Sequence, residues 1–307
     1  MKDLQIKGVL PAAVLPMTSD YEPDFKAYAH YLDWLVSQKA IAFAINMDTG
    51  EGPQLTAAER RKAAEVAVDV AGSRVGVVAG VSGATTNDAV AMARMYKEVG
   101  VGGLVVFPNA AFRNDPLDPR IPYEYHKAIA DATGLPIILF QLAPVFGGVN
   151  YTRETLLKLL TIPQVVGIKE ASFDAQYFAY TTETLAMSRE IVLLTGNDVF
   201  ITESFLLGAT GALLGFCAIG CGMTAEMLLK FQQGQPQEGV AMRPRVQGFA
   251  DFIYKRPMLD YRARCKVALA HIGVLDRSRT FVRPPMLQIG DEEYEEIGHA
   301  LERAGML

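Results

Sequence analysis

Cysteine is scarce in this chain of 307 residues, which contains only Cys217, Cys221 and Cys265. Three scattered thiols cannot build a disulfide framework, and their low number favours a reducing compartment. Long apolar runs are also missing, because none approaches the roughly 18 residues that a membrane-spanning helix needs. The net charge is −5 and no run of lysine or arginine is longer than three residues, which argues against nucleic acids and membranes as partners. We therefore expect a cytoplasmic protein.

Sequence motifs for phosphate and metal binding are missing as well. We find neither G-x-G-x-x-G after an early strand nor G-x-x-x-x-G-K-S/T. Cys217 and Cys221 in CAIGC are not accompanied by a second cysteine pair or by suitably spaced histidines. Because a zinc site needs about four ligands in recognisable spacing, we expect buried thiols here and no metal.

What the sequence does contain is a regular alternation of short apolar runs with longer amphipathic segments. Half of the residues (50%) are hydrophobic and the mean hydropathy is +0.16, which is ordinary for a globular protein with a large core. Near-continuous apolar strands are typical of a parallel sheet that is covered on both faces. The pattern predicts a closed (β/α)8 TIM barrel, with an open doubly wound sheet as the alternative. The apolar runs occupy residues 8–17, 40–47, 74–81, 102–108, 136–142, 165–171, 191–196 and 211–216.

The segments between these runs carry helix signals. Thr56 precedes an amphipathic segment and is followed by Glu59 in the spacing of a capping box. The segment 85–100 ends at Gly100, a typical helix C-cap. Beyond residue 222 we predict helices only, and we divide the chain into a barrel and a C-terminal helical extension packed on it. The barrel covers residues 1–222 and the extension 223–307, with helices expected at 223–233, 237–254, 258–274 and 290–304.

Lys169, at the end of the sixth predicted strand in VVGIKEAS, is the first candidate for chemistry. In barrels of this type the reactive groups lie at the carboxyl ends of the strands and in the loops that follow. Desolvation lowers the pKa of a buried amine, and a neutral amine is a nucleophile for carbonyl groups. A lysine here could instead extend its charged end to solvent, so its position alone leaves both interpretations open. The same end of the barrel carries DTGEG (48–52), FQLAP (140–144) and TGND (195–198).

The ordered set DTGEG, GIKEAS, TGND and GATGALLG resembles the dihydrodipicolinate synthase/N-acetylneuraminate lyase family of class I aldolases. The resemblance implies that Lys169 forms an imine with pyruvate or another 2-oxo acid, without a metal or an organic cofactor. It also implies that Thr49 and the backbone N–H groups around Gly50 hold the substrate carboxylate. We also assign Gln141, Gly196 and Leu213 to substrate binding. For Gln141, in FQLAP, two roles stay open, because its side chain could orient a substrate hydroxyl or only satisfy backbone groups.

The chain departs from the family pattern at positions that matter for proton transfer. Phe140 stands where the family has a tyrosine that shuttles protons, so this position keeps the ring and loses the hydroxyl. Asp48 replaces the first threonine of the family's Gly-Thr-Thr-Gly-Glu loop, where it could act as a base or only cap the loop. The segment 144–151 has no arginine for a second carboxylate. The candidates for the missing acid–base role are Asp48, Thr49, Tyr151 and bound water.

We therefore predict a lyase, either an aldolase or a dehydratase, that acts on pyruvate or another 2-oxo acid through Lys169. Dihydrodipicolinate synthase activity itself is not expected. The alternative is a catalytically degenerate barrel that binds 2-oxo acids as a sensor or regulatory protein. A third possibility is a sugar-phosphate enzyme, disfavoured because the glycine-rich segment 208–222 has no basic residue. The resemblance also implies a homo-oligomer, a dimer or a tetramer, although Asn109-Ala110 replaces the tyrosine pair that reaches a neighbouring subunit in the family.

Overall fold

Seven parallel strands form one sheet, in the order in which they occur along the chain. The computed structural model describes residues 4–307, so the first three residues of the predicted barrel lie outside it. Every strand pairs in parallel with the next one, and the register places Phe140 beside Lys169. The strands are β1 (Ala42–Ile45), β2 (Gly76–Val81), β3 (Gly103–Val106), β4 (Ile137–Leu142), β5 (Val165–Ala171), β6 (Val192–Thr195) and β7 (Gly211–Ala212).

The first predicted strand, residues 8–17, closes this sheet into a ring without becoming a regular strand itself. On one side the Leu10 N–H donates to the Ala212 carbonyl of β7 at 2.8 Å, and on the other the Ala44 N–H of β1 donates to the Pro11 carbonyl at 3.0 Å. Proline has no N–H for a ladder, which explains why only isolated bridges form here. The TIM barrel is confirmed, with one irregular segment, residues 8–17, in place of the first of the eight predicted strands.

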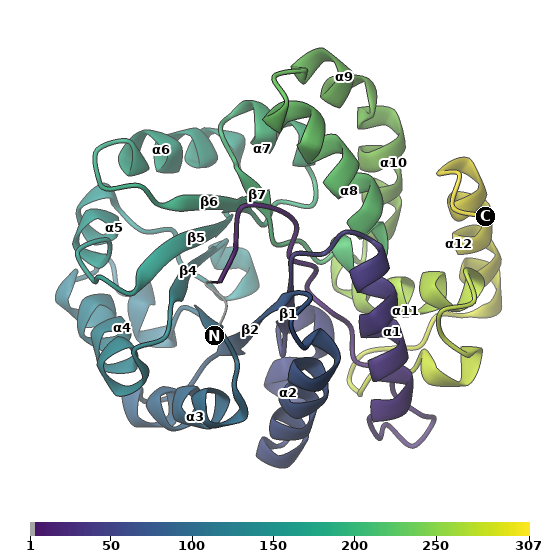
Figure 1. Cartoon of the computed structure of the whole chain (residues 1–307), viewed down its shortest axis with the longest axis horizontal. Coiled ribbons are helices and arrows are strands. Elements are labelled where there is room, and N and C mark those ends of the chain that lie inside the picture. The colour runs from purple at the N-terminus through teal and green to yellow at the C-terminus, as the bar shows by residue number, and fades with distance from the viewer. Residues whose placement is uncertain (1–3) are drawn as a thin grey trace.

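Helices surround this ring, as Figure 1 shows for α2 to α6. Helix α2 begins after the predicted cap Thr56, whose hydroxyl accepts the Glu59 N–H while the Glu59 carboxylate accepts the Thr56 N–H. Gly100 ends α3 with a φ of 97°, a left-handed conformation that favours glycine. The helices of this part are α1 (Phe25–Ser37), α2 (Ala57–Ala71), α3 (Thr86–Val99), α4 (Arg120–Thr133), α5 (Arg153–Leu159), α6 (Ala175–Leu185) and α7 (Ile201–Leu206).

The C-terminal region is helical, as predicted, but its helix boundaries differ from the expected ones. Helix α8 begins at Cys217 and runs through residue 222, the predicted end of the barrel. The single helix predicted over 237–254 is two helices, because Pro244, which lacks an N–H, stands in the first turn of the second. No helix within residues 4–307 is long and apolar enough to cross a membrane. The helices are α8 (Cys217–Gln232), α9 (Pro236–Ala241), α10 (Arg243–Ile253), α11 (Tyr261–His271) and α12 (Asp291–Arg303).

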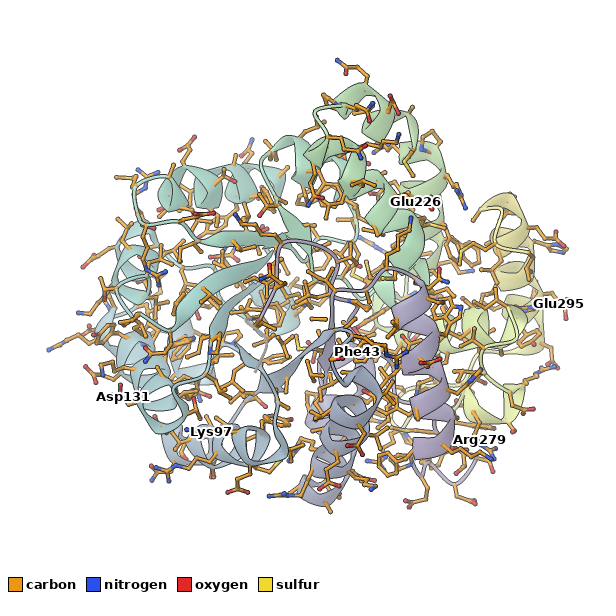
Figure 2. All side chains as sticks on the ribbon, in the orientation of Figure 1. Phe43, Lys97, Asp131, Glu226, Arg279 and Glu295 are labelled. Carbon is orange, nitrogen blue, oxygen red and sulfur yellow. The ribbon has the colours of Figure 1, made fainter. Side chains whose placement is uncertain are left out.

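Apolar side chains form two clusters, one inside the ring of strands and one between the strands and the helices. Phe43 of β1 belongs to the outer cluster and is fully buried, whereas Lys97 and Asp131 project from the surface in Figure 2. Phe140 of β4 belongs to the inner cluster. Because alternate residues of a strand point to opposite faces, strand position decides which side chains can reach the interior of the barrel.

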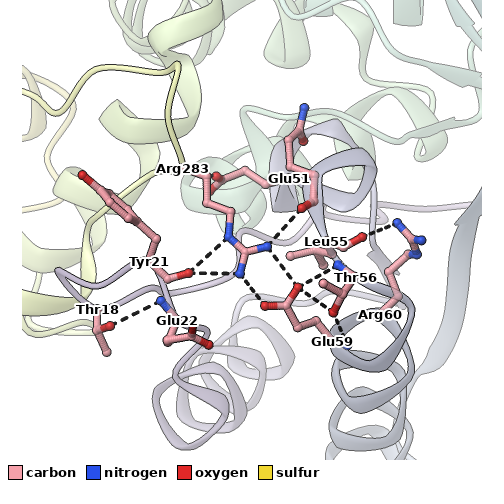
Figure 3. Close-up of polar contacts among 10 residues, drawn as sticks. Thr18, Tyr21, Glu22, Glu51, Leu55, Thr56, Glu59, Arg60 and Arg283 are labelled. Carbon is pink, nitrogen blue, oxygen red and sulfur yellow. Dashed lines mark hydrogen bonds and ion pairs between the residues drawn. The ribbon is translucent and has the colours of Figure 1, made fainter.

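Buried charges tie the C-terminal region to the loop that follows β1. The Nζ atom of Lys266 in α11 lies 2.6 Å from Oε1 of Glu51, and both side chains are buried. Glu51 has a φ of 56°, which residues other than glycine rarely adopt. Its second carboxylate oxygen accepts the backbone N–H of Arg283 at 2.8 Å. Figure 3 shows the Arg283 guanidinium between the Tyr21 carbonyl and the Glu59 carboxylate. The shape of this loop therefore depends on cations from the far end of the chain.

Replacing Lys266 by methionine leaves the Glu51 carboxylate buried without its cation. We expect Lys266→Met to lower the free energy of unfolding by about 3–5 kcal/mol, the usual loss when one partner of a buried ion pair is removed. Urea unfolding followed by circular dichroism measures this loss. Lys127→Met, which breaks the exposed pair with Asp131, is the matched control and should lose less than about 1 kcal/mol. Equal losses in the two variants would contradict the structural role of the buried pair.

Candidate active site

A cavity of about 420 Å³ opens at the carboxyl ends of the strands. Its walls come from the loops after β1, β4, β5 and β6 and from the C-terminal region. The residues predicted from the sequence that line it are Asp48, Thr49, Phe140, Lys169 and Gly196. The structure adds to this wall the polar side chains of Asp198, Tyr254, Tyr261, Arg262 and Arg283.

Lys169 ends inside this cavity rather than in solvent. Its side chain lies on the inner face of β5 and is 9% exposed. The Nζ atom is 4.0 Å from the centroid of the Phe140 ring, which faces it from the neighbouring strand β4. Gly196 makes room for the lysine stem, because a Cβ at that position would lie 2.7 Å from Lys169 Cε. The interpretation in which Lys169 extends to the surface does not fit this geometry.

Burial changes the acidity of the Lys169 amine. Removal from water disfavours the charged form and lowers the pKa of Lys169 to about 8. The negative charges of Asp48 and Asp198 act in the opposite direction and limit this drop. No ion pair joins Lys169 to a carboxylate within the part of the chain that the structure describes. A useful share of the amine is therefore neutral near pH 7, as addition to a carbonyl requires.

Asp198, in the loop after β6, is the second acidic group of the cavity, after Asp48, whose charge acts on Lys169. Its side chain is buried, its carboxylate accepts the Phe216 N–H at 2.8 Å, and it interacts with the hydroxyl of Tyr254. Burial raises the pKa of Asp198 to about 6, and these interactions together with Lys169 partly offset the rise. At neutral pH the site therefore holds a buried carboxylate whose charge favours a cation formed at Lys169.

Two stacked tyrosines from the C-terminal region complete the polar wall. The hydroxyl oxygen of Tyr261 lies 3.2 Å from Oγ1 of Thr49, and the Tyr254 ring stacks on the Tyr261 ring with centroids 4.7 Å apart. Gly215 permits this close approach, because a Cβ there would lie 2.0 Å from the Tyr254 hydroxyl and 3.2 Å from Thr49 Oγ1. Burial raises the pKa of both phenols. Both tyrosines are therefore protonated hydrogen-bond donors at neutral pH.

Gln141, one of the residues predicted to bind substrate, does not line the cavity. It follows Phe140 in β4 and therefore points to the opposite face of the strand. Its amide oxygen accepts the Tyr151 N–H at 3.0 Å, and its amide nitrogen donates to Thr181 at 3.0 Å and to Glu170 at 3.2 Å. These contacts agree with a structural role for Gln141 rather than with binding of a substrate hydroxyl. Glu170 lies on this same outer face, in agreement with the strand alternation.

Three other expected residues also lie outside the cavity lining. The Gly50 N–H donates to the Met47 carbonyl at 3.1 Å, within the short 3-10 turn that follows β1. Leu213 is fully buried in the inner apolar cluster. Tyr151 has a buried hydroxyl without a hydrogen-bond partner among the described residues. Of the acid–base candidates named from the sequence, the structure brings Asp48 and Thr49 to Lys169 and leaves Tyr151 apart.

Several residues of the cavity were not singled out from the sequence. Asp198 stands in TGND directly after β6, so the rule that reactive groups follow strands could have found it. The two tyrosines and Arg262 come from a helical region without a recognisable motif, and only the fold brings them to the barrel mouth. The Nε atom of Arg262 donates to the Asp48 carbonyl at 2.6 Å. Arg262 thus places a cation in the cavity, whereas the segment 144–151 contains no arginine.

A sequence profile of the Dihydrodipicolinate synthetase family matches residues 5–304. The chain belongs to this family. The 4-hydroxy-tetrahydrodipicolinate synthase of Gluconacetobacter diazotrophicus is 27% identical to it over 312 residues, covering 100% of both chains. N-acetylneuraminate lyase from Fusobacterium nucleatum superimposes with a TM-score of 0.85 at 19% identity, over 97% of this chain and 98% of the lyase. A family protein from E. coli K12 in complex with pyruvate gives 0.87 at 19% identity, over 98% and 99%.

These similarities confirm the family resemblance, and with it the TIM-barrel class. The sequence relatives also identify the chain as a lyase of this family, because they are named as synthases and as a lyase. The structural neighbours share less than a quarter of their residues with this chain, so they establish the fold alone. The roles of individual residues in the cavity depend on the geometry given above.

Substituting Gly196 by alanine tests the space reserved for Lys169. The added Cβ would meet Lys169 Cε at 2.7 Å and Ala171 Cβ at 2.8 Å, which forces the lysine from its place. We expect Gly196→Ala to slow imine formation with pyruvate about 100-fold, since a displacement of about 1 Å can cost this much. Cyanoborohydride trapping measures the rate. Gly248→Ala in α10, where nothing lies within 4 Å of the new Cβ, is the control and should match the wild type.

The lowered pKa of Lys169 predicts how imine formation depends on pH. Only the neutral amine adds to a carbonyl, so the rate should rise with pH and level off above a midpoint near the pKa of about 8. Trapping rates with pyruvate between pH 6 and pH 10, in buffers of equal ionic strength, give this midpoint. Asp198→Asn removes a negative charge that raises the pKa of Lys169, and should move the midpoint to lower pH. A midpoint above about 10, typical of an exposed lysine, would be incompatible with the buried amine.

Proposed function

We propose that this protein is a Schiff-base lyase that acts on pyruvate or another 2-oxo acid through Lys169. The observation that carries the proposal is a buried amine with a lowered pKa, at the end of a barrel strand and in a cavity large enough for a small oxo acid. Membership of the family supports it, as does a structural neighbour that was solved in complex with pyruvate. The site uses a covalent imine and takes no metal or organic cofactor.

The chemistry begins with addition of the neutral Lys169 amine to the C2 carbonyl. One proton is taken up and one water leaves, which gives a protonated imine. This cation forms where the Phe140 ring lies 4.0 Å from the nitrogen, and an aromatic face over a cation stabilises it by about 0.5–2 kcal/mol. The carboxylate of Asp198 provides a second source of stabilisation, because it acts on the charge of Lys169 already in the free enzyme.

The protonated imine then acts as an electron sink for one of two outcomes. In an aldolase, a base removes the proton of a C4 hydroxyl and the C3–C4 bond breaks. An aldehyde leaves, and the electron pair of the broken bond forms an enamine. In a dehydratase, a base removes a proton from C3, and the resulting enamine expels the C4 hydroxyl, which takes up a proton and leaves as water. In the aldolase, the enamine takes a proton at C3 and becomes an imine again. Both sequences then end with hydrolysis of an imine, which restores the free lysine. The residues of the cavity are compatible with either outcome.

The substrate carboxylate is assigned to the loop after β1. Thr49 lines the cavity with its hydroxyl, and the neighbouring Gly50 lets the loop pass close to the barrel, since a Cβ there would lie 2.6 Å from the Ala13 carbonyl oxygen. We infer a substrate other than that of dihydrodipicolinate synthase, because Phe140 removes the hydroxyl on which that reaction depends in the family. Arg262 and Arg283 line the cavity, so a second anionic group on the substrate is compatible with this wall.

A catalytically degenerate barrel that binds 2-oxo acids as a sensor is the second candidate, and the observation that favours it is the phenylalanine at position 140. The unpaired, desolvated amine argues against it, because binding alone does not require a nucleophile. We further propose that the protein works in the cytoplasm as a homo-oligomer and that its partner is a small oxo acid. The division into a barrel, 1–222, and a packed extension, 223–307, is likewise our proposal.

Borohydride trapping tests the proposed function directly. Incubation with pyruvate and borohydride should add a reduced pyruvyl group to the peptide that contains Lys169, as seen by mass spectrometry of a digest. Lys169→Ala should abolish the adduct, whereas Lys127→Ala, at an exposed position on α4, should leave it unchanged. If pyruvate and a panel of larger 2-oxo acids give no adduct but still raise the melting temperature, the sensor becomes the better description.

A further inference from the structure

The site described above holds a nucleophile but lacks the strand tyrosine that would move protons around it. Imine formation needs such a group, because addition of an amine to C2 leaves protons on nitrogen and negative charge on oxygen. The proton must travel from nitrogen to oxygen, and a second proton must reach the oxygen before it departs as water. Phe140, the ring nearest to Lys169 Nζ at 4.0 Å, has no hydroxyl to carry either proton.

The C-terminal region supplies hydroxyl groups from the other side of the cavity. We propose that Tyr261, hydrogen-bonded to Thr49 and stacked on Tyr254, transfers protons to and from the substrate bound at Lys169, and so replaces the hydroxyl missing at Phe140. The inference rests on the proposed function, because it needs an imine at Lys169. It extends that function by assigning the acid–base step to a residue outside the strands and their loops.

The position of Tyr261 is fixed from several sides. Its hydroxyl oxygen lies 3.2 Å from Thr49 Oγ1, in the loop assigned to the substrate carboxylate. Its ring is held against Tyr254, with centroids 4.7 Å apart and planes inclined by 16°. The guanidinium of Arg262 lies 5.2 Å from the centroid of the same ring. A catalytic proton carrier must be held in this way, since general acid–base catalysis depends on a fixed donor–acceptor geometry.

Tyr254 has a different part in this arrangement. Its hydroxyl interacts with the Asp198 carboxylate, whereas the Tyr261 hydroxyl bonds the Thr49 hydroxyl. A hydroxyl pair such as Tyr261 and Thr49 can both give and accept a proton, as a shuttle requires. Tyr254 is therefore a positioning residue, which holds the Tyr261 ring and connects the wall to the carboxylate.

The approach of both tyrosines depends on a glycine that no other residue could replace. A Cβ at Gly215 would lie 2.0 Å from the Tyr254 hydroxyl oxygen, 2.8 Å from Tyr261 Cε2 and 3.2 Å from Thr49 Oγ1. All three side chains of the proposed arrangement thus meet over this single position after β7. The space beside Gly215 is consistent with a built site rather than with chance packing of a helical tail on a barrel.

Imine formation leaves the number of protons on Tyr261 unchanged. Tyr261 gives its hydroxyl proton to the oxygen on C2 and takes a proton back from the nitrogen, so the tyrosine is unchanged. A further proton from solvent reaches the same oxygen, the C2–O bond breaks, water leaves, and the C2–N double bond carries the positive charge. Loss of a proton from C3 then gives the enamine, and its return from solvent exchanges the methyl hydrogens of pyruvate.

Deuterium exchange into pyruvate tests this assignment without knowledge of the second substrate. In heavy water, wild-type enzyme should exchange the methyl hydrogens of pyruvate, as followed by proton NMR. Tyr261→Phe keeps the stacked ring, and should slow this exchange at least ~100-fold, the lower end of what general acid–base catalysis contributes. The final yield of borohydride-trapped Lys169 should stay unchanged, because a proton carrier alters rates and leaves the imine equilibrium alone.

Two variants serve as references. Tyr254→Phe should slow the exchange less than Tyr261→Phe, because the stacking ring remains. Tyr123→Phe removes a hydroxyl on α4 outside the cavity lining and should exchange like the wild type. Exchange by Tyr261→Phe within about threefold of wild type would overturn the inference, as would a parallel fall in trapped Lys169, the sign of a structural role. Absence of any trapped adduct in the wild type would instead refute the proposed function.

Discussion

The cost of burying an amine is the constraint around which this site is organised. Two lysines are buried among residues 4–307, and their surroundings differ in kind. Lys266 is matched by the Glu51 carboxylate at 2.6 Å, which is how a buried charge is normally tolerated. Lys169 has an aromatic face and only more distant negative charges. The paired lysine holds the structure through its carboxylate partner, while Lys169 has no such partner among the described residues and is partly neutral and available for reaction.

The other features of the cavity follow from this unpaired amine. Gly196 provides the room for its stem, Phe140 faces its nitrogen, and Asp198 lies close enough to favour a positive charge without forming an ion pair. The paired lysine contributes indirectly, because Glu51 belongs to the loop that carries Asp48 and Thr49. The loop after β1 thus connects the cavity to the buried ion pair of Glu51 and Lys266. Its geometry depends on Lys266 in α11 and on Arg283.

The sequence was sufficient for the barrel, the capped helices and the position of Lys169, because these depend on periodicity, local caps and the order of strands. It was less reliable for Gln141, which was predicted to bind substrate. Strand alternation turns this side chain to the outer face of β4. The run 8–17 was overestimated as a strand, since its prolines interrupt the ladder. Tyr254 and Tyr261 could not have been found, because their distance from Thr49 along the chain gives no local signal. Contacts of that kind exist only after the tail has packed on the barrel.

The packing of this tail also has a consequence for how the protein is made. The lining of the cavity begins at Met47 and ends at Met286, so its wall includes residues from nearly the whole length of the chain. During synthesis from the amino terminus, the strands and Lys169 emerge first, while Tyr261 and the cation that fixes Glu51 emerge only near the end. A nascent chain therefore carries the nucleophile without the wall that surrounds it. The amine becomes shielded and selective only when the last helices are released and dock.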